Sequence, residues 1–215
     1  TKADSVTRSI KSKSRRCHDD RARGMTTRSN IVLLYAARGV RGFGDGFAIL
    51  ILPAYLTAIG YDPVQIGLVA TASLLGTALL TLTIGAIAAR HDLRTLLLVG
   101  AALMAATGLA FPNVEQFAFV ALVAFVGTVN PSTGDLGVLV PIEHALLAHG
   151  VENQERTRTF ARYSLIGALS TAAGSLAAAA PDFLALAGIG TVSAFKLMFY
   201  AYAALGVLSA LLYRR

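Results

Sequence analysis

The stretch Ala89-Arg90-His91-Asp92-Leu93-Arg94 is a short charged interruption between two long runs, residues 64–88 and 95–114, that contain no charged side chain. Each run is long enough to cross a bilayer as an α-helix, which takes about 20 apolar residues. The interruption is too short to be a domain and too charged to lie in lipid. It therefore predicts a tight turn between two membrane-spanning helices. Its two arginines place the turn in the cytoplasm, because Lys and Arg are enriched in short cytoplasmic loops.

The composition of the whole chain also predicts an all-α integral membrane protein. Of its 215 residues, 55% are hydrophobic and only 14% are charged, whereas a soluble domain carries about a quarter of charged residues. The net charge of +7 could suggest nucleic acid as a partner. The basic residues lie in a tail and in short loops, so they indicate membrane topology and contact with anionic lipid instead. Cys17 is the single cysteine, which excludes an internal disulfide and a cysteine-based zinc site.

The sequence divides into a tail and a membrane domain. Residues 1–30 are rich in Ser, Arg and Lys, contain nine of the nineteen basic residues before Asn30, and are expected to be disordered. Met25 precedes a plausible start, so we interpret residues 1–24 as a non-native extension; a basic targeting or lipid-binding tail is the alternative. Residues 31–215 are expected to form a domain of six spans. The expected spans are residues 31–60, 64–88, 95–111, 116–140, 163–180 and 195–213.

The distribution of basic residues predicts that both termini are cytoplasmic. Only Lys196 falls near the opposite interface, while residues 141–162 form the longest polar segment after the tail. Abundant Gly and Ala predict a tight bundle, because small residues let helices approach closely in lipid. The basic residues on the cytoplasmic side are those of the tail, Arg90, Arg94, Arg156, Arg158, Arg162, Arg214 and Arg215.

Several short motifs resemble a known family. Residues 85–97 read Gly-Ala-Ile-Ala-Ala-Arg-His-Asp-Leu-Arg-Thr-Leu-Leu, which resembles the pattern G-x-L-A-D-R-x-G-R-R-x-x-L of the major facilitator superfamily. Residues 41–46, 52–56 and 158–164 show further partial likeness to that family. Ala89 stands where the pattern has Asp, and Asp92 replaces its second Gly.

The resemblance covers residues 31–215 and is to the N-terminal half of such a transporter. It implies an MFS-like half bundle of six helices that helps to move a small solute by alternating access. It also implies a gating-loop motif, represented here by Gly85, Arg90, Asp92 and Arg94. The family's second six-helix half is expected either from a longer protein, of which this chain would be a fragment, or from a homodimer partner.

Asp45 is the sharpest candidate for a site residue. An acid inside a membrane helix is costly and usually faces a partner or a water-filled cavity. Arg41 lies four residues before it and Arg38 seven, so the three share nearly one helix face. The alternative is a local ion pair that anchors the helix near its cytoplasmic end. Four nearby glycines favour a functional role, since they permit close packing or a bend.

Asp135 is the second candidate, in the polar and helix-breaking stretch that begins at Asn130. Broken helices in transporters tend to line binding sites. Asp45 and Asp135 are expected at similar depths, where they could share a cavity with Arg41 and hold a coupling proton. The alternative is a simple kink with Asp135 at the interface. Tyr55 is a further candidate for lining the cavity.

The remaining motifs predict no enzyme, no cofactor and no metal site. Glu143, His144 and His149 do not match a recognised ligand spacing. The expected partners are the lipid bilayer, an unidentified small solute and a second six-helix half, and the expected location is a bacterial-type inner or plasma membrane. Two other classes stay open. A membrane scaffold or assembly protein would leave Asp45 without solvent access, and an intramembrane enzyme would need Asp45 and Asp135 as its catalytic pair.

Overall fold

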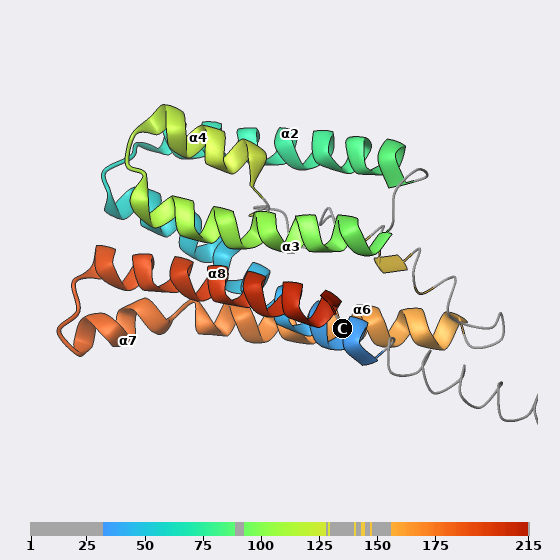
Figure 1. The fold of residues 1–215 in the computed structure, drawn as a ribbon. Coiled ribbons are helices and arrows are strands. Elements are labelled where there is room, and N and C mark those ends of the chain that lie inside the picture. Colours follow the sequence, from blue (N-terminus) through green and yellow to red (C-terminus); the bar gives the residue numbers. More distant parts are fainter. Residues whose placement is uncertain are drawn as a thin grey trace, which may run out of the picture.

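The computed structural model describes residues 32–88, 93–127, 129, 140, 143, 144, 147 and 156–214. Throughout this part of the chain the backbone forms helices joined by short turns, with no strand (Figure 1). The order of elements is a first helix at residues 32–58, α2 (Pro63–Ala88), α3 (Leu93–Ala110), the 3-10 helix η1 (Phe111–Asn113), α4 (Phe117–Val126), α6 (Arg156–Ala177), α7 (Ala180–Leu186) and α8 (Thr191–Arg214).

Among the described residues, four candidate spans are long and apolar enough to cross a membrane, by length and composition. The predicted class, an all-α membrane protein, agrees with this finding. The predicted number of six spans and the cytoplasmic location of both termini stay predictions. The four candidate spans are Pro63–Ile87, Arg94–Asn113, Arg156–Leu186 and Thr191–Arg214.

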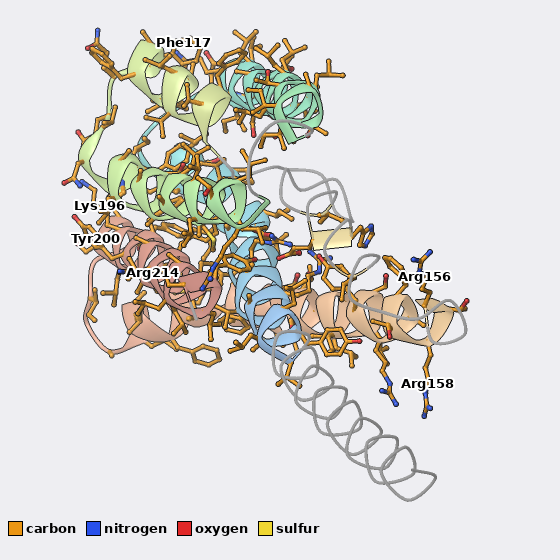
Figure 2. All side chains as sticks on the ribbon, turned by 45° about the vertical axis from the view of Figure 1, so that its right-hand side comes forward. Phe117, Arg156, Arg158, Lys196, Tyr200 and Arg214 are labelled. Carbon is orange, nitrogen blue, oxygen red and sulfur yellow. The ribbon has the colours of Figure 1, made fainter. Side chains whose placement is uncertain are left out.

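Helix α6 begins at Arg156, well before the expected start of the fifth span at residue 163. Residues 156–162 contain neither Gly nor Pro, so nothing in the backbone stops the helix where the lipid ends. Figure 2 shows Arg156 and Arg158 on the end of α6 that projects beyond the other described helices. Residues 156–162, which were expected to belong to the polar segment, thus extend the helix of the fifth expected span.

The other differences concern the ends of spans. Pro181, expected to end the fifth span, lies in the first turn of α7, where its missing N–H costs no hydrogen bond. Helix α4 ends at Val126, and the backbone N–H of Gly127 is bonded to the carbonyl of Val123. Most of residues 128–139, expected to continue this span, lie outside the described residues.

The turn between the first helix and α2 follows directly from its residues. Gly60 has φ of 94°, a left-handed conformation that suits glycine at a helix end. The N–H of Tyr61 then reaches back to the carbonyl of Leu56. Asp62 and Gln65 exchange two hydrogen bonds, at 2.8 and 3.1 Å, in the reciprocal capping arrangement that starts α2.

Glycines set the distances between three pairs of helices. Gly46 of the first helix lies against the backbone of Thr171 in α6, and Gly174 of α6 lies against the backbone of Phe43. Gly76 of α2 meets the backbone of Phe125 in α4 in the same way. Close backbone approach at small residues is the usual way in which helices pack in lipid.

The third pair is α3 with α8, which lie side by side in Figure 1. Gly108 of α3 faces the backbone of Ala203 in α8, and Gly206 of α8 faces the backbone of Ala105. The glycine-rich composition thus has a specific use, because in each of the three pairs a glycine lies where an added Cβ atom would overlap the neighbouring backbone.

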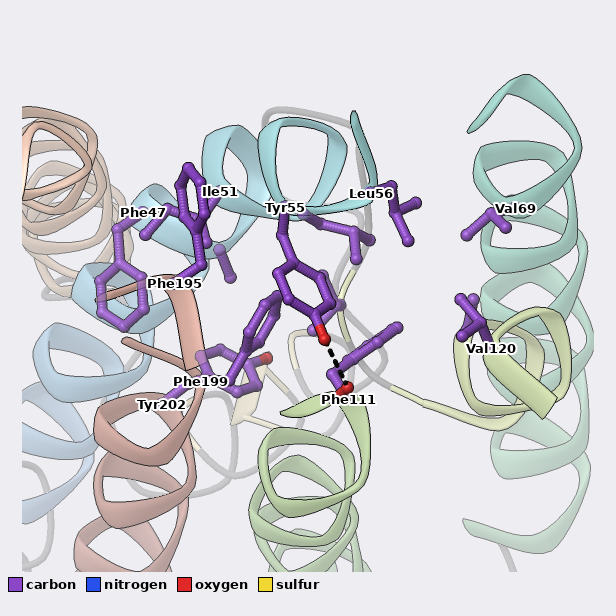
Figure 3. Close-up of a cluster of buried hydrophobic side chains, with 14 of the residues drawn as sticks. Phe47, Ile51, Tyr55, Leu56, Val69, Phe111, Val120, Phe195, Phe199 and Tyr202 are labelled. Carbon is purple, nitrogen blue, oxygen red and sulfur yellow. Dashed lines mark hydrogen bonds between the residues drawn. The ribbon is translucent and has the colours of Figure 1, made fainter. Parts of the chain in front are cut away.

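An apolar core joins the first helix to α3, α4 and α8 (Figure 3). Tyr55 lies at its centre, fully buried, with its ring edge-on to Phe199 at 5.3 Å between centroids. Its hydroxyl group donates a hydrogen bond of 3.4 Å to the carbonyl of Phe111. Val69 of α2 and Val120 of α4 close the cluster on the other side.

The end of the bundle opposite to Arg156 carries a small polar cluster. Lys196 of α8 forms an exposed ion pair of 3.1 Å with Glu115, which lies just before α4. The hydroxyl group of Tyr61 donates to the carbonyl of Glu115 at 2.9 Å. Lys196, the basic residue that the sequence places near the interface opposite to the cytoplasm, therefore has an acidic neighbour.

The glycine contacts give a first prediction. Gly46→Ala should destabilise the protein, because the added methyl group would overlap the backbone of Thr171, and overpacking costs about 1–3 kcal/mol. Gly67→Ala is the matched control on α2, where the methyl group would meet no atom within 4 Å. Thermal unfolding in detergent should show a lower Tm for Gly46→Ala only. Equal Tm values would contradict the packing described here.

Candidate functional site: a buried cluster of charges

Glu143 is a fully buried carboxylate at which three helices converge. Arg41 of the first helix binds it through both nitrogens, with Nη1 at 3.2 Å from Oε1 and Nη2 at 2.7 Å from Oε2. The hydroxyl groups of Tyr163 on α6 and Tyr213 on α8 also donate hydrogen bonds to it. A bidentate guanidinium and two hydroxyl donors are what a carboxylate needs to be buried without water.

Arg41 is therefore paired with Glu143, which is distant in sequence, rather than with Asp45 one turn away. The alternative of a local anchoring pair is not the contact that forms. Side chains on a helix lean toward its N-terminus, so the long side chain of Arg41 extends away from Asp45. An acid placed before a base also makes a better pair at this spacing than the reverse order found here.

Asp45 is partly buried, and it accepts a hydrogen bond of 3.1 Å from the hydroxyl group of Tyr202 on α8. A carboxylate can accept about four hydrogen bonds, so this contact leaves capacity for a ligand or a proton. The negative charge of Asp45 lies close to Arg41, whose own direct partner is Glu143.

Arg38 is buried as well, and its guanidinium carbon lies 5.1 Å from the centre of the Tyr163 ring. This is within the range of a cation–π interaction. Arg38 and Arg41 together balance the charges of Glu143 and Asp45. Arg38, Arg41 and Asp45 were expected on one helix face. The structure adds Glu143, an acid distant in sequence, as the direct partner of Arg41.

His144 and Glu143 have contacts of their own. The His144 ring lies edge-on to Phe160 and Tyr163, at 5.2 and 5.1 Å between centroids. Its Nε2 atom is buried and lacks a hydrogen-bond partner in the part of the chain that the structure describes. The carboxylate of Glu143 is bound by Arg41 through both oxygens. No group of three potential metal ligands occurs among the described residues.

The gating-loop motif is only partly within the described residues. Arg94, at the start of α3, donates a hydrogen bond of 2.7 Å from Nε to the carbonyl of Tyr213, and a second one to the carbonyl of Arg214. A cation at carbonyls without helical partners stabilises the C-terminal end of a helix. Gly85 is exposed, with open space where a side chain would lie. Arg90 and Asp92 lie outside the described residues.

The other predicted site residues are placed apart from this cluster or not described. Tyr55 lies in the apolar core, and its ring and hydroxyl contacts are those of a packing residue. Asn130 and Asp135 lie outside the described residues, so a cavity shared by Asp45 and Asp135 stays a prediction.

Sequence reasoning missed Glu143 and the tyrosines that contact the two acids. Glu143 was assigned to a polar segment, although it is the only charged residue between Leu136 and Gly150. That isolation within an apolar run was the available signal. Tyr163 and Tyr202 were not among the site candidates, because a single tyrosine in an apolar helix does not indicate its polar partner.

The Glu143 cluster gives a second prediction. Glu143→Gln should lower the stability strongly, because removing one partner of a buried ion pair costs about 3–5 kcal/mol. Glu115→Gln, which breaks the exposed pair with Lys196, should change stability little. Thermal unfolding of both variants in detergent tests this. The double variant with Arg41→Gln should lose less than the sum of the single losses, and strict additivity would contradict a direct pair.

Comparison with known proteins agrees with this architecture. The family model described as Major Facilitator Superfamily matches residues 34–215. The uncharacterized membrane protein YJR124C of Saccharomyces cerevisiae is 28% identical over 177 residues, which cover 81% of this chain and 40% of that protein. The chain thus spans well under half the length of this relative. With helices long enough to span a membrane and a family match over most of its length, the chain is an integral, multi-pass membrane protein that belongs to the major facilitator superfamily.

Proposed function

We propose that this chain is the N-terminal six-helix half of a secondary transporter that moves a small solute by alternating access. In such proteins two helical bundles rock around a site near the middle of the membrane. The match to the superfamily supports the transporter class. The greater length of the yeast relative leaves room for a second bundle, with a homodimer partner as the other source of that half.

Asp45 carries this proposal. It is a partly exposed acid in an otherwise apolar stretch of the first helix, and the nearest guanidinium is already bound to Glu143. An ionisable residue inside the membrane is costly, and it usually faces a water-filled path or the interior of the bundle. We infer that Asp45 receives a cationic or hydrogen-bonding group of the solute, or a coupling proton.

The Arg41–Glu143 pair has a different part in this scheme. Its four hydrogen bonds join the first helix to α6, α8 and the segment at residue 143. A pair held in this way is suited to fix the first helix rather than to bind and release a solute. Asp135 and Asn130 complete the proposed site on the sequence argument alone.

Arg94 supports a role of the gating-loop motif in joining helix ends. Its hydrogen bonds to Tyr213 and Arg214 connect the start of α3 to the last turn of α8. We propose that this end of the bundle is cytoplasmic, together with Arg156 and Arg158 of α6, as the enrichment of basic residues there suggests.

A membrane scaffold without transport is the alternative function, and solvent access to Asp45 separates the two. Ile49 lies one turn after Asp45 and is partly buried, while Ala48 is fully buried. With Cys17 replaced by Ser, Ile49→Cys in the protein expressed from its complete gene should react with a membrane-impermeant cationic thiol reagent. Adding Asp45→Asn should slow that reaction severalfold, since it removes the attracting charge.

Ala48→Cys is the matched control and should not react, and an anionic reagent should show no loss of rate with Asp45→Asn. The assay is done from each side of sealed vesicles. If Ile49→Cys fails to react from either side, the path is closed and the scaffold is favoured. If it reacts at the same rate with and without Asp45, the proposed role of this acid is wrong.

A further inference from the structure

Tyr202 lies next to Asp45 in an unusually constrained setting. It is fully buried on α8, and its hydroxyl group donates to Oδ1 of Asp45 at 3.1 Å. Its ring packs edge-on against Phe47 at 6.1 Å between centroids. A methyl group placed on Gly44 would lie 3.2 Å from the Tyr202 ring. The ring therefore packs closely against the backbone of Gly44, where no side chain intervenes.

Helix α8 has little freedom to move Tyr202 away from the acid. The neighbouring Phe199 and Ala203 are pressed against Gly108 of α3, and Gly206 is pressed against Ala105. These contacts lie on either side of Tyr202 along α8. Moving its hydroxyl group would require a shift of the whole α3–α8 pair, since packed interiors resist small displacements.

We propose that Tyr202 is the positioning residue for Asp45, which keeps the carboxylate in one orientation and remains hydrogen-bonded to it in both protonation states. A tyrosine hydroxyl group is both a donor and an acceptor. It donates to Oδ1 when Asp45 is charged, and it can accept from the carboxylic acid when Asp45 is protonated. This role rests on the proposed function of Asp45 as a binding or proton-carrying residue.

The charged groups around Asp45 come from two parts of the chain. Arg38 and Arg41 lie on its own helix, and Glu143 lies across from it. Arg41 and Glu143 are bound to each other. Tyr202 is thus the uncharged hydrogen-bonding partner among the described neighbours of Asp45, and its substitution by Phe changes no charge in the cluster.

The test uses a carbodiimide, which reacts with protonated carboxylic acids, and mass spectrometry to follow its adduct on Asp45. The full-length protein in detergent is labelled across a range of pH. In Tyr202→Phe the ring contacts stay, but Asp45 loses a hydrogen bond that is stronger to the charged carboxylate than to the neutral acid, so the charged form loses more stabilisation. Labelling of Asp45 should therefore persist to a pH higher by about one unit than in the unaltered protein.

Tyr200→Phe is the matched control, because Tyr200 lies on the same helix, is exposed, and directs its hydroxyl group toward Asn113 instead. Its labelling profile should coincide with that of the unaltered protein. If the labelling profile of Tyr202→Phe also coincides with that of the unaltered protein, and its Tm is unchanged, the positioning role of Tyr202 is overturned. The proposed function then stands. If Asp45 shows no pH-dependent labelling in any variant, it does not take up a proton in this range, and the inference falls together with the proton-carrying role of Asp45, while the binding of a solute group is decided by the thiol-reaction test.

Discussion

The burial of Glu143 is the constraint on which the packing of the first helix, α6 and α8 depends. A carboxylate taken out of water costs several kcal/mol, and within the protein only hydrogen-bond donors can replace its lost hydration. The charge is tolerated because Arg41, Tyr163 and Tyr213 each donate to it. Those residues come from the first helix, α6 and α8, so the three helices must meet at one place for the cluster to be satisfied.

Backbone contacts at glycines fix the distances within two helix pairs around this cluster. Gly46 and Gly174 bring the first helix and α6 together, while Gly108 and Gly206 do so for α3 and α8. Van der Waals packing and buried polar contacts are the main sources of helix association in lipid, since apolar surface gains little from leaving it. Asp45 and Tyr202 meet between these two glycine-based pairs.

Much of the architecture could be predicted from periodicity and composition, because membrane spans depend on local properties of the chain. Continuous apolar runs indicated α2, α3 and α8, and residues 61–63, left between the first two expected spans, form a turn that contains the cap of α2. The early start of α6 was missed, because arginines mark the edge of the lipid and not the end of a helix.

The site was harder to predict, because its contacts join residues far apart in sequence. Asp45 and Arg41 could be selected as costly charges in an apolar helix. Their partners could not, since Arg41 and Glu143 are separated by 102 positions and Asp45 and Tyr202 by 157. Local spacing allowed a pair between Arg41 and Asp45 as an alternative, but in the structure each of the two residues has a long-range partner instead.

In the proposed function, Asp45 lies at a path for solute or protons between two helical bundles. The most direct test is a structure of the full-length protein in a lipid nanodisc, determined by cryo-electron microscopy. The account predicts a second helical bundle facing the first helix, with Asp45 lining a water-filled space between them and bonded to Tyr202. A structure in which Asp45 faces lipid, or is sealed within a packed interface, would contradict it.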